Sequence, residues 1–494
     1  MRAMANSFTR SVALNTIVQL LGKVVTTVLA LVLIAALTRY LGVSSFGAYT
    51  TVFAYVAFLG VLADFGFFWI MVREIARTDE RKRFDAIVSN VLTLRTFLGI
   101  AIFALGSLVA WFIPQYSYEV RAGIVVISIA WLGTALNSTF VGVFQNKLRM
   151  DKAVLTDIAG RTITLGLTLW FILRGGDLAT ILWAYVAGTW LNLILSFLVG
   201  RAYVTVRPRF EFGEWKRIFW EAFPMGVVLV FHVIYFRIDS VMLSLMKGTT
   251  DVGIYGAPYK ILDVLLTLPV MFLGNVFPML ARLLAEKSDR IPGIIQRSFD
   301  ALLTIALPLT VGGMLLAAPI VRVVAGDAFV NATTLPPVFG QPATAVLVLQ
   351  ILMVTAGLGF LSNLGNYIMI ALGKQRQLIW PFASFIFVNV ILNFVLIPHF
   401  SYIGSAFATG ATELVVAVYL GILALKATKV RIHLGIAWRI VLATTVMGLF
   451  LAYAPLPFAA KLVGGVVVYL VAAWATGVIS PDLIRELTSF RKSA

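Results

Sequence analysis

Five basic side chains lie within stretches of the sequence that otherwise read as apolar, membrane-spanning helices. They are Lys23, Arg95, Arg161, Arg237 and Lys260. A charge at the centre of a bilayer costs about 2.5–3.5 kcal/mol, so such residues usually face a water-filled cavity or a partner inside a helix bundle. Cations held in that setting predict an interior that receives an anionic group.

Four acidic residues lie at similar depth, namely Asp64, Asp239, Asp263 and Glu413. Each could bind a coupling proton or sodium ion, because intramembrane carboxylates commonly mark ion pathways. The alternative is that they only balance the cations, and this is at least as good an interpretation for Asp239 and Asp263. Glu413 has no basic residue within ten positions, which makes it the better coupling candidate.

A polar stripe runs along the first apolar segment. Asn15, Gln19, Lys23 and Thr27 recur every four residues, which places them on one helical face. We expect that face to line the interior, with Asn15 and Gln19 as polar cavity residues beside Lys23.

A second stripe lies on the segment that begins near residue 252. Tyr255, Tyr259 and Asp263 repeat the four-residue spacing, and Lys260 is three residues before Asp263. Residues three or four apart on a helix can pair. Lys260 is therefore either a ligand-binding cation beside the two tyrosines or a partner of Asp263.

The other cations differ in whether an acid nearby in the sequence could form an ion pair with them. Arg161 follows Asp157 by four residues, which favours a structural ion pair, whereas Lys23 and Arg95 have no acid within four positions. Lys23 and Arg95 are thus the strongest candidates for binding an anionic headgroup. Lys23, Arg95 and Arg161 are expected in the middle or inner part of the membrane. Arg237 and Lys260 are expected nearer its outer side, so the cations form a staggered ladder along which a headgroup could pass.

Composition excludes an ordinary soluble domain. The chain has 494 residues, of which 60% are hydrophobic and 12% charged. It has no cysteine and three histidines scattered along its length, which argues against a metal site or a thiol nucleophile. The net charge of +17 reflects lysine and arginine in loops, so no nucleic-acid partner is expected.

The elements that must position these residues are transmembrane helices. A requirement of about 20 apolar residues per helix predicts fourteen spans, beginning near residues 12, 46, 86, 121, 153, 178, 219, 252, 297, 344, 376, 402, 436 and 458. Alternate loops together with the two ends of the chain hold 28 of the 39 lysines and arginines. Both termini are therefore expected in the cytoplasm. No loop is long enough for a catalytic domain, so an enzyme is not expected.

An internal repeat suggests how the helices are grouped. Residues 42–49 read GVSSFGAY and residues 248–255 read GTTDVGIY, at a constant offset of 206 residues. Because an even number of spans separates the two copies, they share an orientation. We predict two six-helix lobes around a central cavity, at residues 1–205 and 206–430, followed by two further helices and a cytoplasmic tail at 431–494.

Several segments resemble one family in sequence and in order. They include LTRYLGVSSFGAY (37–49), ADFGF (63–67), VREIAR (72–77), YFRIDSVML (235–243), VGIYGAPYKI (252–261), IALGKQR (370–376) and IPHFSYIGSAFAT (397–409). These resemble the polysaccharide and lipid-linked oligosaccharide (O-antigen-type) flippases of the multidrug/oligosaccharidyl-lipid/polysaccharide (MOP) exporter superfamily.

The resemblance implies a flippase of a prokaryotic plasma membrane that works by alternating access. Its substrate would be a polyprenyl-(pyro)phosphate-linked oligosaccharide, moved from the cytoplasmic to the outer leaflet for surface polysaccharide assembly. Phosphate would meet the cations, membrane lipids would hold the tail, and polysaccharide assembly proteins would be further partners. No cofactor is expected beyond coupling to a proton or sodium gradient.

Two relatives in the same superfamily remain as alternatives. A peptidoglycan lipid-precursor flippase needs the same cationic cavity. A multidrug exporter shares the architecture, but cationic drugs favour acidic cavities, and five deep cations argue against it.

Overall fold

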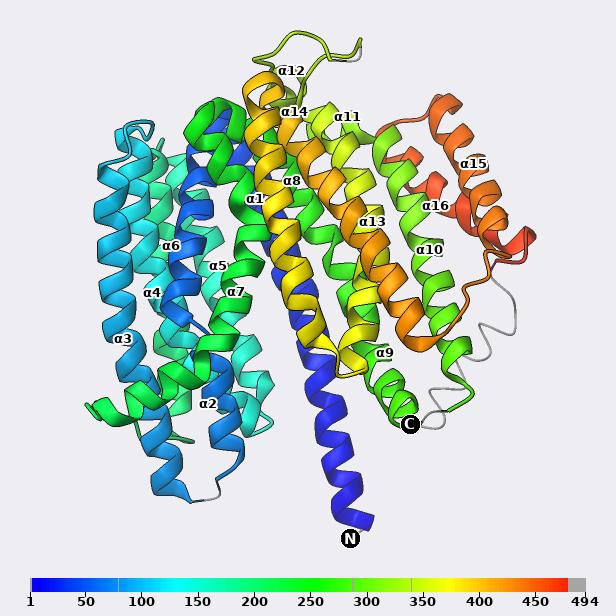
Figure 1. The fold of residues 1–494 in the computed structure, drawn as a ribbon. Helices are drawn as coiled ribbons and strands as arrows, with labels where there is room; N and C mark the ends of the chain where they lie inside the picture. The colour runs from blue at the N-terminus through cyan, green and yellow to red at the C-terminus, as the bar shows by residue number, and fades with distance from the viewer. Residues whose placement is uncertain (1, 79, 287, 339, 479–494) are drawn as a thin grey trace. The chain divides into compact units, whose positions relative to one another are not determined.

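The computed structural model describes residues 2–78, 80–286, 288–338 and 340–478, without the side chains of residues 2–17, 20 and 285 (Figure 1). Over these residues the regular secondary structure is helical, and turns, loops and one isolated β-bridge, between Val338 and Gln341, connect the helices. The first seven helices are α1 (Arg2–Asp64), α2 (Phe67–Ala76), α3 (Arg81–Trp111), α4 (Tyr118–Asn146), α5 (Met150–Leu173), α6 (Leu178–Gly200) and α7 (Phe212–Met246).

The remaining helices continue in the same manner. They are α8 (Thr249–Leu265), α9 (Thr267–Ala285), α10 (Ile291–Leu315), α11 (Ala317–Ala325), α12 (Asp327–Asn331), α13 (Ala345–Ala371), the 3-10 helix η1 (Gln375–Leu378), α14 (Ile379–Thr428), α15 (Ala437–Tyr453) and α16 (Phe458–Ala475). The fold class predicted from the sequence is confirmed: the protein is an all-helical, multi-pass membrane protein.

Two of the helices are bent and consist of two arms each. The backbone of α1 leaves helical geometry at Gly42 (φ 69°), and that of α14 does so at Ser401 (φ 44°). Each bent helix therefore supplies two successive spans.

The predicted spans can be matched to these elements. Ten helical segments of the described chain are long and apolar enough to cross a membrane, and two of them, Leu21–Ala76 and Gln375–Thr428, contain the bent helices. When the arms of the bent helices are counted separately and α5 and α15 are added, the described residues provide fourteen helical passes. Their starting points follow those expected from hydropathy.

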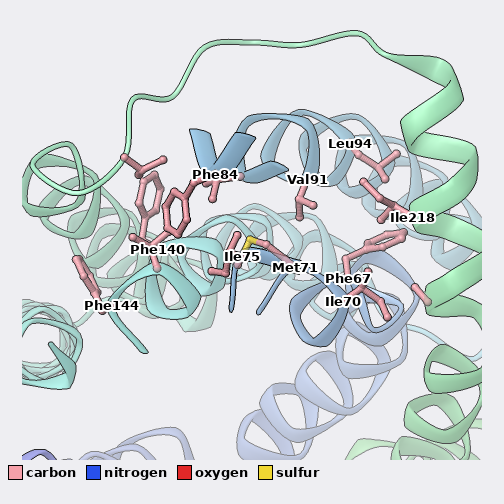
Figure 2. Close-up of a cluster of buried hydrophobic side chains, with 14 of the residues drawn as sticks. Phe67, Ile70, Met71, Ile75, Phe84, Val91, Leu94, Phe140, Phe144 and Ile218 are labelled. Atoms are coloured by element: carbon pink, nitrogen blue, oxygen red, sulfur yellow. The ribbon is translucent and has the colours of Figure 1, made fainter. Parts of the chain in front are cut away.

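The chain divides into two compact units, Met1–Gly253 and Ile254–Ala494. A cluster of aromatic and aliphatic side chains from α2, α3, α4 and α7 forms a core of the first unit (Figure 2). In the second unit, one core joins α9, α10, α13 and α14, and another joins α10 to α15 and α16. The lobe boundaries expected after residues 205 and 430 stay a prediction.

The two copies of the repeated motif use their glycines in the same two ways. Gly42 and Gly248 both have positive φ, 69° and 108°, a region that favours glycine. Gly47 and Gly253 face each other, because a Cβ on Gly47 would overlap the carbonyl oxygen of Thr249, and one on Gly253 would overlap that of Val43. The motif is therefore a turn followed by a backbone-to-backbone helix crossing.

The tyrosine of each motif copy also has an equivalent role. The hydroxyl of Tyr49 lies 2.6 Å from that of Tyr185 on α6, and the hydroxyl of Tyr255 lies 3.2 Å from Oγ1 of Thr409 on the second arm of α14. Helix α6 is the sixth pass and the second arm of α14 is the twelfth. The same hydroxyl contact, between the second and sixth helices of each half, supports an internal duplication.

Helices α15 and α16 pack onto α10 in the second unit. Ile440, Met447 and Leu451 of α15 are buried in this contact, and the hydroxyl of Tyr469 on α16 donates a 2.6 Å hydrogen bond to the carbonyl oxygen of Thr304. The last two passes are thus attached to the second unit through both apolar and polar contacts.

Candidate functional site

The fully buried side chain of Arg95 is held in a polar cluster of the first unit. Its side chain is 0% exposed and forms an ion pair with Asp64 at the end of α1. The guanidinium also donates to the hydroxyls of Ser138 (2.6 Å) and Thr139 (2.9 Å) on α4. A buried charge that is paired and hydrogen-bonded is stable in an apolar interior. In this conformation Arg95 ties α3 to α1 and α4 and is closed to a ligand.

Asp64 is consequently a structural partner as well as a coupling candidate. It lies 31 residues from Arg95 on another helix, so the local sequence gave no sign of the pair. The next two residues, Phe65 and Gly66, both have positive φ and end the helix. The Phe65 ring stacks on Phe219 of α7, with ring centroids 5.5 Å apart. The turn that follows Asp64 therefore packs against α7.

Lys23 is accessible in the first arm of α1. Its side chain is exposed, and no acid within the described part of the chain lies in ion-pair range of it. Gln19, one turn earlier on the predicted stripe, is also exposed, whereas the side chain of Asn15 falls outside the described residues. Of the two strongest candidates from sequence, Lys23 is thus exposed and Arg95 is buried, and the anion-binding role of Lys23 stays a prediction.

Arg161 forms the local ion pair that its spacing suggested. Its Nε lies 3.0 Å from Oδ2 of Asp157, and the two side chains are 50% and 39% exposed. Because both groups remain accessible and the pair is separated by a single helical turn, it can open at little cost. The ligand-binding role expected for Arg161 stays a prediction.

Arg237 and Asp239 lie two residues apart on α7 in very different surroundings. Arg237 is half-buried, whereas Asp239 is 1% exposed, and both take part in polar or electrostatic contacts. The two side chains leave the helix in different directions, as the spacing required. Their predicted roles in headgroup binding and ion coupling stay untested.

The second unit contains the other predicted cation. Nζ of Lys260 lies 3.9 Å from Oδ2 of Asp263, and the side chains are 22% and 27% exposed. Tyr255 and Tyr259 are buried on the same helix, α8, with ring centroids 5.3 Å apart. The expected helical cluster of two tyrosines, a lysine and an aspartate is therefore present, with the lysine already close to its acid.

Glu413 is on the second arm of α14 in the second unit, and its side chain faces α13. It accepts a hydrogen bond from the hydroxyl of Ser362, and a Cβ on Gly359 would lie 3.8 Å from its Oε1. Ser362 is 51 residues away in the sequence, so this partner could not be read from local spacing. A half-buried carboxylate beside a hydroxyl is a suitable proton-binding group.

One charged cluster was not anticipated, at the contact between α2 and α7. Arg73 pairs with Glu221, and Arg217 lies 2.9 Å from Glu221 and 2.8 Å from Glu214. The three- and four-residue spacing of Glu214, Arg217 and Glu221 could have predicted their ion pairs on one helix. Nothing in the local sequence indicated that Arg73 of α2 would join them. A cavity of about 150 Å³ adjoins this cluster.

The wall of that cavity combines apolar and polar groups. It includes Ile70, Met71 and Ile218, together with Glu74 and Asn90. In the described part of the chain, no group of three His, Asp or Glu side chains is arranged to hold a metal ion.

Comparison with known proteins places the chain in a family. The model of a family described as "Polysaccharide biosynthesis protein" matches residues 12–284, which is more than half of the chain. The chain belongs to this family. The match covers the passes that carry all five intramembrane cations. The family resemblance seen in the sequence motifs is confirmed.

Two curated relatives carry the name "Putative O-antigen transporter". The protein from Shigella dysenteriae is 24% identical over 248 residues, which is 50% of this chain and 61% of the relative. The protein from Shigella flexneri is 22% identical over 330 residues, or 64% of this chain and 77% of the relative. The aligned part thus spans less than two thirds of the first relative and about three quarters of the second.

Two solved transporter structures share the fold of this chain. The lipid II flippase MurJ, in an inward closed conformation, has a TM-score of 0.74 at 14% identity, covering 93% of this chain and 98% of MurJ. An inward-facing multidrug resistance MATE transporter of the MOP superfamily has a TM-score of 0.68 at 13% identity, covering 82% of this chain and 94% of its own. At such identities the likeness concerns the fold.

Proposed function

We propose that this protein is a flippase that moves a polyprenyl-(pyro)phosphate-linked oligosaccharide from the cytoplasmic to the outer leaflet for surface glycan assembly. The observation that carries the proposal is the family match over residues 12–284, within which all five intramembrane cations lie. The names of the two Shigella relatives support the same class of substrate. The protein acts as a transporter rather than as a catalyst.

The chemistry of the substrate fits the charged groups. A pyrophosphate is a compact, multiply charged anion, and a lysine inside the membrane region offers it a point charge. Lys23 is exposed and has no acid in ion-pair range among the described residues, so it receives the phosphate first. Arg161 and Lys260, each beside a nearby acid, exchange that acid for phosphate as transport proceeds. The oligosaccharide occupies a hydrated space and the polyprenyl tail stays in lipid.

Coupling to an ion gradient is part of the proposal. Glu413, which accepts a hydrogen bond from Ser362, is the first candidate for the coupling proton or sodium ion. The protein lies in a prokaryotic plasma membrane with both termini in the cytoplasm, in keeping with the distribution of lysine and arginine among the loops.

The experiment that tests the function uses purified protein in liposomes that contain a fluorescent lipid-linked oligosaccharide. Accessibility of the label in each leaflet is measured with and without a proton or sodium gradient. Wild-type protein should expose the label on the far side, Lys23→Ala should abolish this, and Arg322→Ala, in an exposed pair with Asp327, should behave as wild type. Equal label movement by wild type and empty liposomes would refute the proposal.

A second candidate is the flipping of a peptidoglycan lipid precursor. It is favoured by the fold likeness to the lipid II flippase over 93% of this chain. The same liposomes loaded with lipid II distinguish the two functions. Movement of lipid II without movement of lipid-linked oligosaccharide would replace the first proposal by the second.

A further inference from the structure

The connection between α6 and α7 is an ordered strap rather than a loose loop. We define the strap as residues 204–211, which have no helical structure and pass along α3 as an extended trace (Figure 2). Backbone N–H groups of Thr205, Arg207 and Arg209 each donate a 3.1 Å hydrogen bond to an oxygen atom of a side chain on α3. The strap thus has a fixed register on the helix.

The register follows from matching repeats. The three acceptors are Asp85, Ser89 and Thr93, spaced four residues apart on one face of α3. Four residues of helix advance about 6.0 Å, and two residues of extended chain advance about 6.6–6.8 Å. Alternate N–H groups of the strap therefore meet successive turns of α3.

This register sets which side chains of the strap face outward. Val204 is buried and Val206 half-buried, whereas Thr205, Arg207 and Arg209 are exposed. Alternate side chains of an extended chain point to opposite sides. Arg207 and Arg209 are accordingly presented side by side on a backbone that is already ordered, and Arg209 also lies 2.9 Å from Glu211.

Aromatic side chains continue the surface beyond the strap. Phe97, one turn after Thr93 on the same face of α3, packs against Phe210, with ring centroids 5.6 Å apart. Phe212 packs against Trp215 at 5.2 Å, and Phe210 and Phe212 are 55% and 72% exposed. A cluster of exposed rings beside cations is typical of a membrane–water interface.

The length of α7 places its start at that interface. Its 35 residues would extend about 52 Å, whereas the hydrocarbon core is about 30 Å thick. The surplus lies before Pro224, where Lys216 is exposed among aromatic residues. In Figure 1 the first turns of α7, in green, lie crosswise to the rest of the helix, as an interfacial segment does.

We propose that the strap and the first turns of α7 bind the phosphate headgroups of anionic phospholipids in the cytoplasmic leaflet. Arg207, Arg209 and Lys216 supply the positive charge, and the rings of Phe210 and Phe212 enter the acyl boundary. The occupant is a bulk anionic lipid because the surface combines several cations with exposed aromatic rings, the combination that suits a membrane–water interface. This inference does not depend on what the protein transports.

The test measures lipid binding to the full-length protein purified in detergent. Bound phosphatidylglycerol is counted by native mass spectrometry during a titration, with phosphatidylcholine as the uncharged comparison. Each basic residue near an anionic surface strengthens binding about fivefold. The triple variant Arg207→Gln, Arg209→Gln, Lys216→Gln should therefore bind phosphatidylglycerol at least tenfold more weakly, with binding of phosphatidylcholine unchanged.

Two further variants make the test specific. Arg282→Gln, Arg290→Gln, Arg376→Gln removes three other exposed cations that no ordered strap holds beside exposed rings, and should weaken binding much less than the first triple variant. Ser89→Ala, Thr93→Ala keeps every cation but removes two strap contacts, so it should weaken phosphatidylglycerol binding at least threefold while the protein remains monodisperse. Equal losses in the two triple variants, or wild-type binding in the Arg207 triple variant, would overturn the proposal.

A competition experiment with polyprenyl phosphate distinguishes the two possible sources of a lipid phosphate, namely bulk phospholipid and the transported substrate. It should compete with phosphatidylglycerol at this surface no better than other singly charged lipids. If the Arg207 triple variant loses polyprenyl phosphate while keeping phosphatidylglycerol, the surface belongs to the transported substrate and the present assignment fails.

Discussion

The crossing of Gly47 and Gly253 should tolerate no side chain larger than hydrogen. A Cβ at either position would overlap a backbone carbonyl oxygen, that of Thr249 or Val43, which cannot move aside as a flexible side chain can. The two helices would have to separate by about 1 Å or more to restore normal contact. Gly47→Ala and Gly253→Ala should each destabilise the protein by about 1–3 kcal/mol, the usual range for overpacking.

The pair offers an internal check through additivity. Once the first alanine has separated the helices, the second meets less resistance, so the double variant should cost less than the sum of the two single variants by at least about 0.5 kcal/mol. Gly421→Ala is the matched control, since a Cβ there meets nothing within 4 Å and alanine favours helix. Thermal unfolding in detergent, followed by size-exclusion fluorescence, measures all four variants.

Cross-linking reports the same contact without relying on stability. The natural chain has no cysteine, so an introduced pair has no background. Ser44 Oγ lies 3.2 Å from Thr249 Oγ1, and Ser44→Cys with Thr249→Cys should form a disulfide on mild oxidation. Adding Gly47→Ala should lower the yield. Unchanged unfolding temperature and unchanged yield in that variant would refute the crossing.

Two further predictions concern polar contacts in the first unit. Asp64→Asn should cost about 3–5 kcal/mol because it leaves the fully buried Arg95 charge unpaired, and adding Arg95→Met should recover part of that loss in thermal unfolding. A double variant no more stable than Asp64→Asn would argue against the pair. Asp177 caps α6 by accepting hydrogen bonds from the hydroxyl and N–H of Thr180, which lower its pKa below the usual value. Its stabilisation is therefore complete above its unfolded-state pKa of about 3.9 and is lost as pH falls through the lower folded-state pKa. Asp177→Ala should cost about 1 kcal/mol at neutral pH, Asp177→Asn should cost less, and equal unfolding temperatures for wild type and Asp177→Ala at pH 7 would contradict the cap.

Hydropathy, charge and the repeated motif determined most of the fold. The apolar stretches predicted the fourteen passes, because a bilayer requires every spanning backbone to satisfy its own hydrogen bonds as a helix. The motif predicted a duplication, and the positive φ of Gly42 and Gly248 is the local reason that both copies contain glycine there. Local ion pairs such as Asp157–Arg161 were also readable, since a helix brings residues four apart together.

Only the tertiary structure decided which groups meet across helices. From the sequence, Arg95 and Lys23 looked equally available to a ligand, because neither has an acid nearby in the chain. In the structure, Arg95 is buried and paired with Asp64, 31 residues away, whereas Lys23 is exposed. Helix patterns fix the face on which a side chain lies, but the rotation and depth of each helix against its neighbours depend on packing of the whole bundle. The sequence therefore determined that this protein carries charges inside a membrane, and the packing of the helices decided which of them are already paired.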